Sequence, residues 1–204
     1  NGTGSVLTFG HGLGVKPNAV ILKARNIANN WLVFHQGYGA TKTTFLDANS
    51  STSDNAQWYN DTEPTSSVFT LGTWSGMNTS TPSTIVAYCF SEVAGYSKFG
   101  TYTGNGNANG TFVFIGFRPA WVMIKMSSGS NSWVIYDNKR SPINLVDKRL
   151  RAQGSFAEDT HNGVDFLSNG FKTRNASSTS TNQNGATYIY FAFAEAPFKN
   201  SRAR

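Results

Sequence analysis

The sequence has little of what several common classes of protein require. Its single cysteine, Cys89, excludes an internal disulfide and any metal site built from several thiolates. Asp, Glu, Lys and Arg make up only 14% of the 204 residues, well below the share in an average soluble domain. The longest apolar runs, such as 188–194, are too short for a membrane-spanning helix, so no membrane insertion is expected.

The motifs that mark common enzyme sites are also absent. The sequence has no Gly-x-Ser-x-Gly, no His-Glu-x-x-His and no Gly-x-x-x-x-Gly-Lys-Ser/Thr pattern. Its three histidines, His11, His35 and His161, are not spaced as metal ligands. We therefore expect no catalytic residues, no histidine-bound metal and no enzymatic activity, with a glycan-degrading enzyme as a weaker alternative.

Hydrophobic and aromatic residues are plentiful, at 39% and 14% of the chain, which excludes a disordered protein. The apolar segments are short, rich in β-branched and aromatic residues, and bounded by Gly, Pro, Asn or Ser. Such segments are typical of strands. Only Val146–Ala152 has a pattern compatible with a helical turn or two. The sequence therefore predicts an almost entirely β fold.

The sequence repeats itself at an offset of 102 residues, which becomes 103 near the end of each repeat. Four pairs of segments align: Lys16–Lys23 with Arg118–Lys125, Trp31–Phe34 with Trp133–Tyr136, Phe69 with Phe171, and Ile85–Glu92 with Tyr188–Glu195. The spacing predicts two internal repeats, 1–100 and 101–204.

Repeats of this length fit either two small sandwiches or one two-sheet sandwich of duplicated origin. The join at Gly95–Tyr102 carries aromatic residues and lacks the polar composition of a free linker. We therefore predict a single antiparallel β-sandwich domain over 1–204, a lectin-like jelly roll made of the two repeats. The matching positions of Lys23 with Lys125, and of Glu92 with Glu195, predict a strand-end ion pair within each repeat.

Two polar stretches, Asp47–Ser67 and Ser177–Gly185, are predicted to be surface loops. Aromatic rings stack on the C–H faces of sugars, and amide and carboxylate oxygens bind the hydroxyls. In and near the first stretch the sequence combines both kinds of side chain, so we predict a glycan site formed by Trp58, Tyr59, Asn60, Asp61 and Trp74. The alternative is that the tryptophans fold back onto the core.

The same first stretch contains carboxylate and amide oxygens of the kind that bind Ca²⁺. A calcium ion near Asp54 and Asp61 is therefore a further expectation, although the spacing matches no calcium-loop motif. No other cofactor is expected.

The net charge of +6 comes entirely from the second half of the chain. Residues 1–100 hold five basic and five acidic residues, whereas 101–204 hold twelve and six. The densest basic run contributes Lys139, Arg140, Lys148, Arg149 and Arg151. Such a run is usually a solvated face; the alternative is a patch for an acidic protein partner. No nucleic-acid partner is expected.

Eight segments together carry a resemblance to a known family: 11–17, the strand at Trp31, 37–42, 87–100, 102–106, 116–119, 165–172 and 194–199. Over nearly its whole length the chain resembles virion proteins of marine bacteriophages that are related to tail fibres and other appendages. This resemblance implies a concanavalin A-like sandwich on the virion surface. It also implies contacts with other virion proteins and homo-oligomers, trimers in the case of fibres.

We therefore expect a non-enzymatic virion surface protein, part of a tail fibre or similar appendage, that attaches to the host through surface glycan. The alternative is a structural protein that decorates, cements or forms filaments and binds only other virion proteins. The opening residues Asn1–Gly4 resemble the interior Tyr102–Gly106 without its start, which suggests a piece of a longer chain or a trimmed N-terminus.

Overall fold

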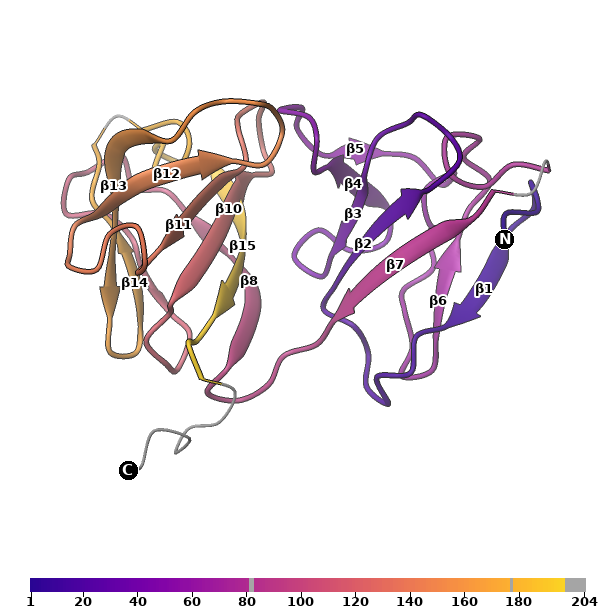
Figure 1. The fold of residues 1–204 in the computed structure, drawn as a ribbon, viewed down its shortest axis with the longest axis horizontal. Helices are drawn as coiled ribbons and strands as arrows, with labels where there is room; N and C mark the ends of the chain where they lie inside the picture. Colours follow the sequence, from indigo (N-terminus) through magenta and orange to yellow (C-terminus); the bar gives the residue numbers. More distant parts are fainter. Residues whose placement is uncertain (81–82, 177, 197–204) are drawn as a thin grey trace. The chain divides into compact units, whose positions relative to one another are not determined.

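The computed structural model describes residues 1–80, 83–176 and 178–196. Within these ranges the chain forms antiparallel strands and no helix, so the prediction of an all-β fold is confirmed (Figure 1). The described part accordingly offers no long apolar helix that would cross a lipid bilayer.

The chain divides into two compact units, Asn1–Ser91 and Glu92–Arg204. Every strand pairing of the described residues lies within one unit or the other, and each unit has its own buried apolar cluster. Two separate small sandwiches, the alternative to a single sandwich, would also keep all strand pairing within each unit. The single domain over 1–204 stays a prediction, and each unit is described by itself.

The first unit contains a five-stranded and a two-stranded sheet. The larger sheet has the order β5-β4-β3-β2-β7, and β1 pairs with β6 in the smaller one (Figure 1). The strands are β1 (Leu7–Gly10), β2 (Ala19–Ala24), β3 (Leu32–His35), β4 (Lys42–Phe45), β5 (Ser53–Asp54), β6 (Val68–Leu71) and β7 (Ile85–Phe90).

The second unit is one eight-stranded sheet with the order β8-β15-β10-β11-β12-β13-β14-β9. The strands are β8 (Ser97–Thr103), β9 (Phe112–Phe114), β10 (Trp121–Met126), β11 (Val134–Asp137), β12 (Val146–Arg151), β13 (Asp159–Leu167), β14 (Gly170–Thr173) and β15 (Thr187–Phe193). The Thr111 hydroxyl donates to the Thr103 carbonyl at 2.7 Å and links the ends of β8 and β9. The sheet therefore nearly closes on itself.

The two units pair their strands in the same order. The series β7-β2-β3-β4-β5 of the first unit runs as β15-β10-β11-β12-β13 in the second, and β6-β1 runs as β14-β9. Alternate residues of a strand face opposite sides of the sheet, so every second residue of a strand can pack into the core of its unit. Val20, Leu22 and Ala24 enter the first core, and the residues 102 positions later enter the second.

One prediction, from the basic segment, is wrong, and one, from the polar segments, is only partly correct. The segment considered for a helical turn forms β12 instead, because Val146 is buried opposite Val164 of β13. The second predicted surface loop begins at Ser177, which lies outside the described residues, but Thr181 and Asn182 farther along it are fully buried. The Asn182 amide donates to the carbonyls of Asn107 and Asn175 at 2.9 and 2.8 Å, so its polar side chain is satisfied in the interior.

The predicted ion pairs within each repeat are also wrong, because the strands run antiparallel. Lys23 lies opposite Val86 and Lys125 lies opposite Ile189, each six residues before the glutamate that was expected to pair with it. Six residues of strand correspond to roughly 20 Å. Glu92 binds Lys98 at 2.6 Å instead, and Glu195 binds Lys139 at 2.7 Å.

We expect Phe171→Ala to lower the free energy of unfolding of the second unit by about 3–5 kcal/mol. Phe171 is fully buried and packs edge-on against Tyr102 and Tyr190. Phe114→Ala on neighbouring β9 is the matched control, because that ring is 65% exposed. Chemical denaturation of both variants tests this, and equal losses would contradict the assigned core.

Lys125 predicts a pH dependence of stability. Its side chain is buried, Nζ donates to the Met126 carbonyl at 2.8 Å, and burial lowers the pKa to about 8. Above that pH the folded protein releases a proton that the unfolded chain keeps until about pH 10, so stability rises with pH in this window. The stability of the wild type relative to Lys125→Met should therefore increase between pH 7 and pH 9.5 in denaturation curves. A constant difference would contradict it.

Candidate functional site

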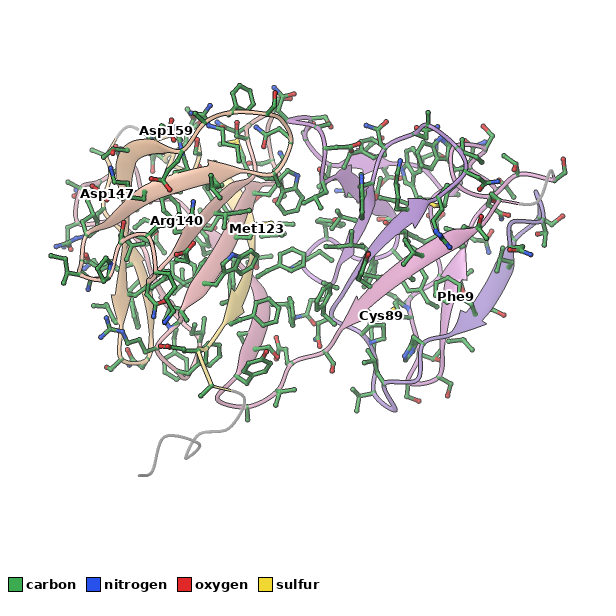
Figure 2. The ribbon with its side chains drawn as sticks, viewed as in Figure 1. Phe9, Cys89, Met123, Arg140, Asp147 and Asp159 are labelled. Atoms are coloured by element: carbon green, nitrogen blue, oxygen red, sulfur yellow. The ribbon has the colours of Figure 1, made fainter. Side chains whose placement is uncertain are left out.

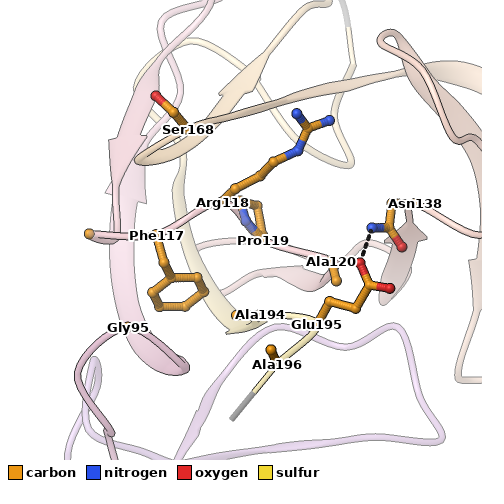
Figure 3. Close-up of a pocket in the computed structure, with 11 residues that line it drawn as sticks. Gly95, Phe117, Arg118, Pro119, Ala120, Asn138, Ser168, Ala194, Glu195 and Ala196 are labelled. Atoms are coloured by element: carbon orange, nitrogen blue, oxygen red, sulfur yellow. Dashed lines mark hydrogen bonds between the residues drawn. The ribbon is translucent and has the colours of Figure 1, made fainter. Parts of the chain in front are cut away.

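A pocket of about 530 Å³ lies at one end of the eight-stranded sheet (Figure 3). Its lining comes from strand ends that are far apart in the sequence: the segment before β10, the turns after β11 and β13, and the chain after β15. The side chains that shape it are Phe117, Arg118, Pro119, Asn138, Ser168 and Glu195. Its volume lies within the range of small-molecule binding sites.

Backbone hydrogen bonds hold the floor of this pocket. Ala120 N–H donates to the Phe193 carbonyl at 2.8 Å, and Asn138 N–H donates to the Ala120 carbonyl at 2.9 Å. Gly116 has a φ of +84°, a conformation that glycine adopts readily, so the chain turns there before Arg118. Pro119 is buried and has no N–H that would need a partner.

The polar side chains that line the pocket differ in their hydrogen bonding. Asn138 Nδ2 approaches Glu195 Oε2 at 3.5 Å, whereas Asn138 Oδ1 is buried with no hydrogen-bond partner among the described residues (Figure 3). Arg118 is exposed and forms no ion pair within the described part of the chain. An exposed guanidinium without a carboxylate partner is available to an anionic ligand.

The equivalent positions in the first unit are occupied differently. Lys16 stands where the second unit has Arg118, and it binds Glu63 at 2.8 Å. Asn18 stands in the place of Ala120, and its Nδ2 donates to Gln36 Oε1 at 2.7 Å. Lys16 and Gln36, the counterparts of Arg118 and Asn138, thus each have a polar partner within the first unit.

The structure places two of the predicted glycan-binding aromatics in the core. Tyr59 is fully buried, packs edge-on against Phe34 and Phe69, and its hydroxyl lies 2.8 Å from Thr43 Oγ1. Trp58 is 7% exposed and packs against Phe45. A ring must expose a face to stack on a sugar. The faces of Trp58 and Tyr59 are instead used within the first unit, so Asp47–Ser67 is an anchored segment rather than a simple surface loop.

The other predicted residues of that site lie nearer the surface. Trp74 is partly buried, with its ring 4.9 Å from that of Trp58. Asn60 and Asp61 are exposed and have positive φ angles of 54° and 47°, a conformation that Asn and Asp tolerate better than most residues. Their role in binding glycan stays a prediction.

The calcium expectation rests on exposed side chains. Asp54 lies on β5 opposite Lys42, and Asp61 follows in the turn after Tyr59. Three or more His, Cys, Asp or Glu side chains do not come together as a metal site anywhere in the described ranges. Calcium binding near Asp54 and Asp61 stays a prediction.

The basic run is largely neutralised by carboxylates of its own unit. Lys139 binds Glu195, Arg140 binds Asp137 at 2.6 Å, and both Arg149 and Arg151 bind Asp159. Lys148 donates to the Thr160 hydroxyl at 2.7 Å. The labelled Arg140, Asp147 and Asp159 in Figure 2 show how acidic and basic side chains mix over this sheet. Four of the five cations therefore have acidic partners and Lys148 has a hydroxyl partner, so the run is not an unpaired positive patch.

Asp159 is the centre of this network. Arg149 donates to both of its carboxylate oxygens, at 2.9 and 2.6 Å, although the Arg149 side chain is only 8% exposed. These hydrogen bonds hold the pKa of Asp159 below its ordinary value and raise that of Arg149. The contact is bidentate, which is the strongest form of an Arg–carboxylate pair.

Comparison with protein families gives a match over residues 1–197 to a family described as a domain of unknown function, DUF7483. The chain belongs to this family. Searches among curated proteins and among solved structures gave no match. A function for the DUF7483 chain therefore has to be inferred from its own sequence and structure.

Sequence reasoning missed the pocket of this DUF7483 chain. In the sequence, Arg118 and Pro119 stand out for their likeness to Lys16 and Pro17, Glu195 stands out as a strand-end residue, and all three lie in segments that resemble the phage family. The useful signal was the difference between the aligned repeats. Ala120 in place of Asn18 removes a side chain at the position where the pocket opens.

We expect Asp159→Asn to lower the free energy of unfolding by about 1–3 kcal/mol at pH 7, because it leaves the buried Arg149 without its counter-charge. Lys139→Gln is the control: it removes an exposed pair, which is worth about 0–1 kcal/mol. The penalty should shrink as the pH falls below about 4, where the unfolded wild-type chain takes up a proton at Asp159, and should vanish only below the lowered pKa of the folded protein. Denaturation at both pH values checks this, and equal effects of the two variants would contradict it.

Proposed function

We propose that this DUF7483 chain is a non-enzymatic virion surface protein of a bacteriophage that attaches to its host through an acidic surface glycan. The observation that carries the proposal is the strand-end pocket, in which the cationic Arg118 lines one space with the polar side chains of Asn138, Ser168 and Glu195. Origin in a phage appendage rests on the sequence resemblance, and binding of an acidic glycan rests on the chemistry of the pocket.

The lining suits a sugar that bears a carboxylate. The Arg118 guanidinium offers planar donors that match a carboxylate in a bidentate contact. The Glu195 carboxylate beside Asn138 offers acceptor oxygens to sugar hydroxyls. Phe117 and Pro119 give the same space an apolar wall for the C–H groups of the ring.

The small number of carboxylates in the pocket supports binding of a glycan rather than its hydrolysis. Glycoside hydrolases generally need two carboxyl groups on opposite sides of the bond that they cleave. Glu195 is the sole acidic residue among the described residues that line this pocket, and its Oε1 is already bound to Lys139. A bound glycan would thus be held without being cleaved.

The remaining features of the proposal concern assembly. We infer a lectin-like sandwich architecture of duplicated origin for the two units, supported by their shared strand order. The resemblance to fibre proteins favours a homo-oligomer, a trimer in a fibre, that contacts other virion proteins. Several weak sites on one particle would reinforce one another through effective concentration. The alternative, a decoration protein that uses its basic run, has less support because four of those five cations already have acidic partners.

The proposal predicts selective loss of glycan binding. We expect the wild-type chain, displayed in many copies, to bind carboxylated glycans on an array, and Arg118→Ala to weaken that binding at least about tenfold through loss of a charged hydrogen-bonded contact. Lys16→Ala is the matched control, because it removes the cation at the equivalent position of the first unit.

Two results would contradict this assignment of the site. The first is equal loss of binding in Lys16→Ala and Arg118→Ala. The second is loss in Trp74→Ala with full binding by Arg118→Ala, which would return the site to the segment that includes Asn60 and Asp61. Release of reducing sugar from bound glycan would contradict the non-enzymatic part of the proposal.

A further inference from the structure

One edge of the five-stranded sheet is open where the matching edge of the other unit is covered. In the first unit β7 ends the sheet and, among the described residues, pairs with β2 alone (Figure 1). Its counterpart β15 pairs with β10 on one side and, along Thr187–Phe193, with β8 on the other. An uncovered edge presents backbone N–H and C=O groups that are free to pair with another strand.

The chain reaches this open edge in the same way as β8 reaches its partner. Gly2 N–H donates to the Ser83 carbonyl at 2.8 Å, just before β7, and Gly104 N–H donates to the Ala186 carbonyl at 2.9 Å, just before β15. The next residue of each unit is also bonded in the same way: Thr3 N–H donates to Asn78 Oδ1, and Asn105 N–H donates to Asn182 Oδ1.

Both glycines sit where no side chain fits. A Cβ on Gly2 would lie 2.2 Å from Ser83 Oγ, and one on Gly104 would lie 2.3 Å from the Gln183 carbonyl oxygen. The backbone that arrives at Gly104 comes directly from β8, which has just run the length of β15. By the same geometry, backbone that arrives at Gly2 from its N-terminal side is directed along β7.

The covering strand completes the core of the second unit. Tyr102 of β8 stacks on Tyr188 with ring centres 5.0 Å apart, and its hydroxyl donates to the Thr181 carbonyl at 2.7 Å. On β7 the core-facing side chains Ile85, Ala87 and Cys89 are only partly buried, although they pack against the first core (Figure 2 labels Cys89). The first core therefore has apolar surface left to cover.

We propose that the open edge of β7 is a docking site for an extended polypeptide strand that leads into Gly2 and pairs antiparallel with β7. The strand has the character of Ser97–Thr103, with a large aromatic residue near its end facing the core and small residues before it. Such strand addition takes its affinity from the backbone ladder and its selectivity from alternate side chains. This inference does not depend on the proposed glycan site.

The experiment compares two versions of the full chain that carry an added segment. In one, the sequence of Gly95–Tyr102 is joined directly ahead of Asn1, so that Asn1 takes the place of Thr103 and follows Tyr102 as Thr103 does in β8. In the other, the same segment has proline at the positions of Lys98 and Gly100, whose N–H groups would point at β7, so no regular ladder can form. Two rates show whether the added strand covers the edge of β7: hydrogen–deuterium exchange of the β7 amides and alkylation of Cys89, the only cysteine of the chain. We expect the intact strand to slow both by at least about tenfold relative to the proline version.

Controls separate cover of the edge from general changes in stability. Exchange in β10 and β11 of the second unit should be the same in both versions. Gly2→Val in the intact version should remove the protection, because its side chain displaces the hydrogen bond to Ser83. Equal exchange and alkylation in the two versions would overturn the proposal. Protection of β7 that grows with protein concentration in the unextended chain would also overturn it, by assigning the edge to a second copy.

Discussion

The antiparallel pairing of β10 with β15 is the constraint on which the second unit depends. Its register places alternate residues of β10, such as Val122 and Ile124, in the core. Antiparallel pairing also brings the start of β10 beside the end of β15. Pro119 and Glu195, which lie just beyond those ends, consequently line one pocket although they are far apart in the sequence.

The strands were predictable because their signal is local. Short aromatic and β-branched segments recur at an offset of 102, and the structure has β2, β3 and β6 in one unit with β10, β11 and β14 at the same spacing in the other. The wrong predictions concern burial and ion pairing, which depend on contacts between residues far apart in the sequence. Asn182 and Thr181 are buried because Asn105 and the Tyr102 hydroxyl, both remote in sequence, bond to them. Strand direction, which composition does not reveal, separated each lysine from its expected glutamate.

The candidate site was harder to predict because it arises from a difference between the units rather than from a motif. The likeness of Arg118 to Lys16 was visible, but only the structure shows that Lys16 is bound to Glu63 while Arg118 remains available. The converse holds for the basic run and for Trp58. The sequence shows the charges of that run and the aromatic ring of Trp58. In the structure, Arg149 and Arg151 are bound to the Asp159 carboxylate, and Trp58 is packed in the first core.

Binding of an acidic saccharide at the strand-end pocket is tested most directly by an NMR titration of the ¹⁵N-labelled chain with digalacturonate. The predicted result is that saturable shift changes gather on 116–120, Asn138 and 194–196, the segments that meet at the pocket. Shift changes confined to Asn60, Asp61 and Trp74, or none at millimolar ligand, would contradict it.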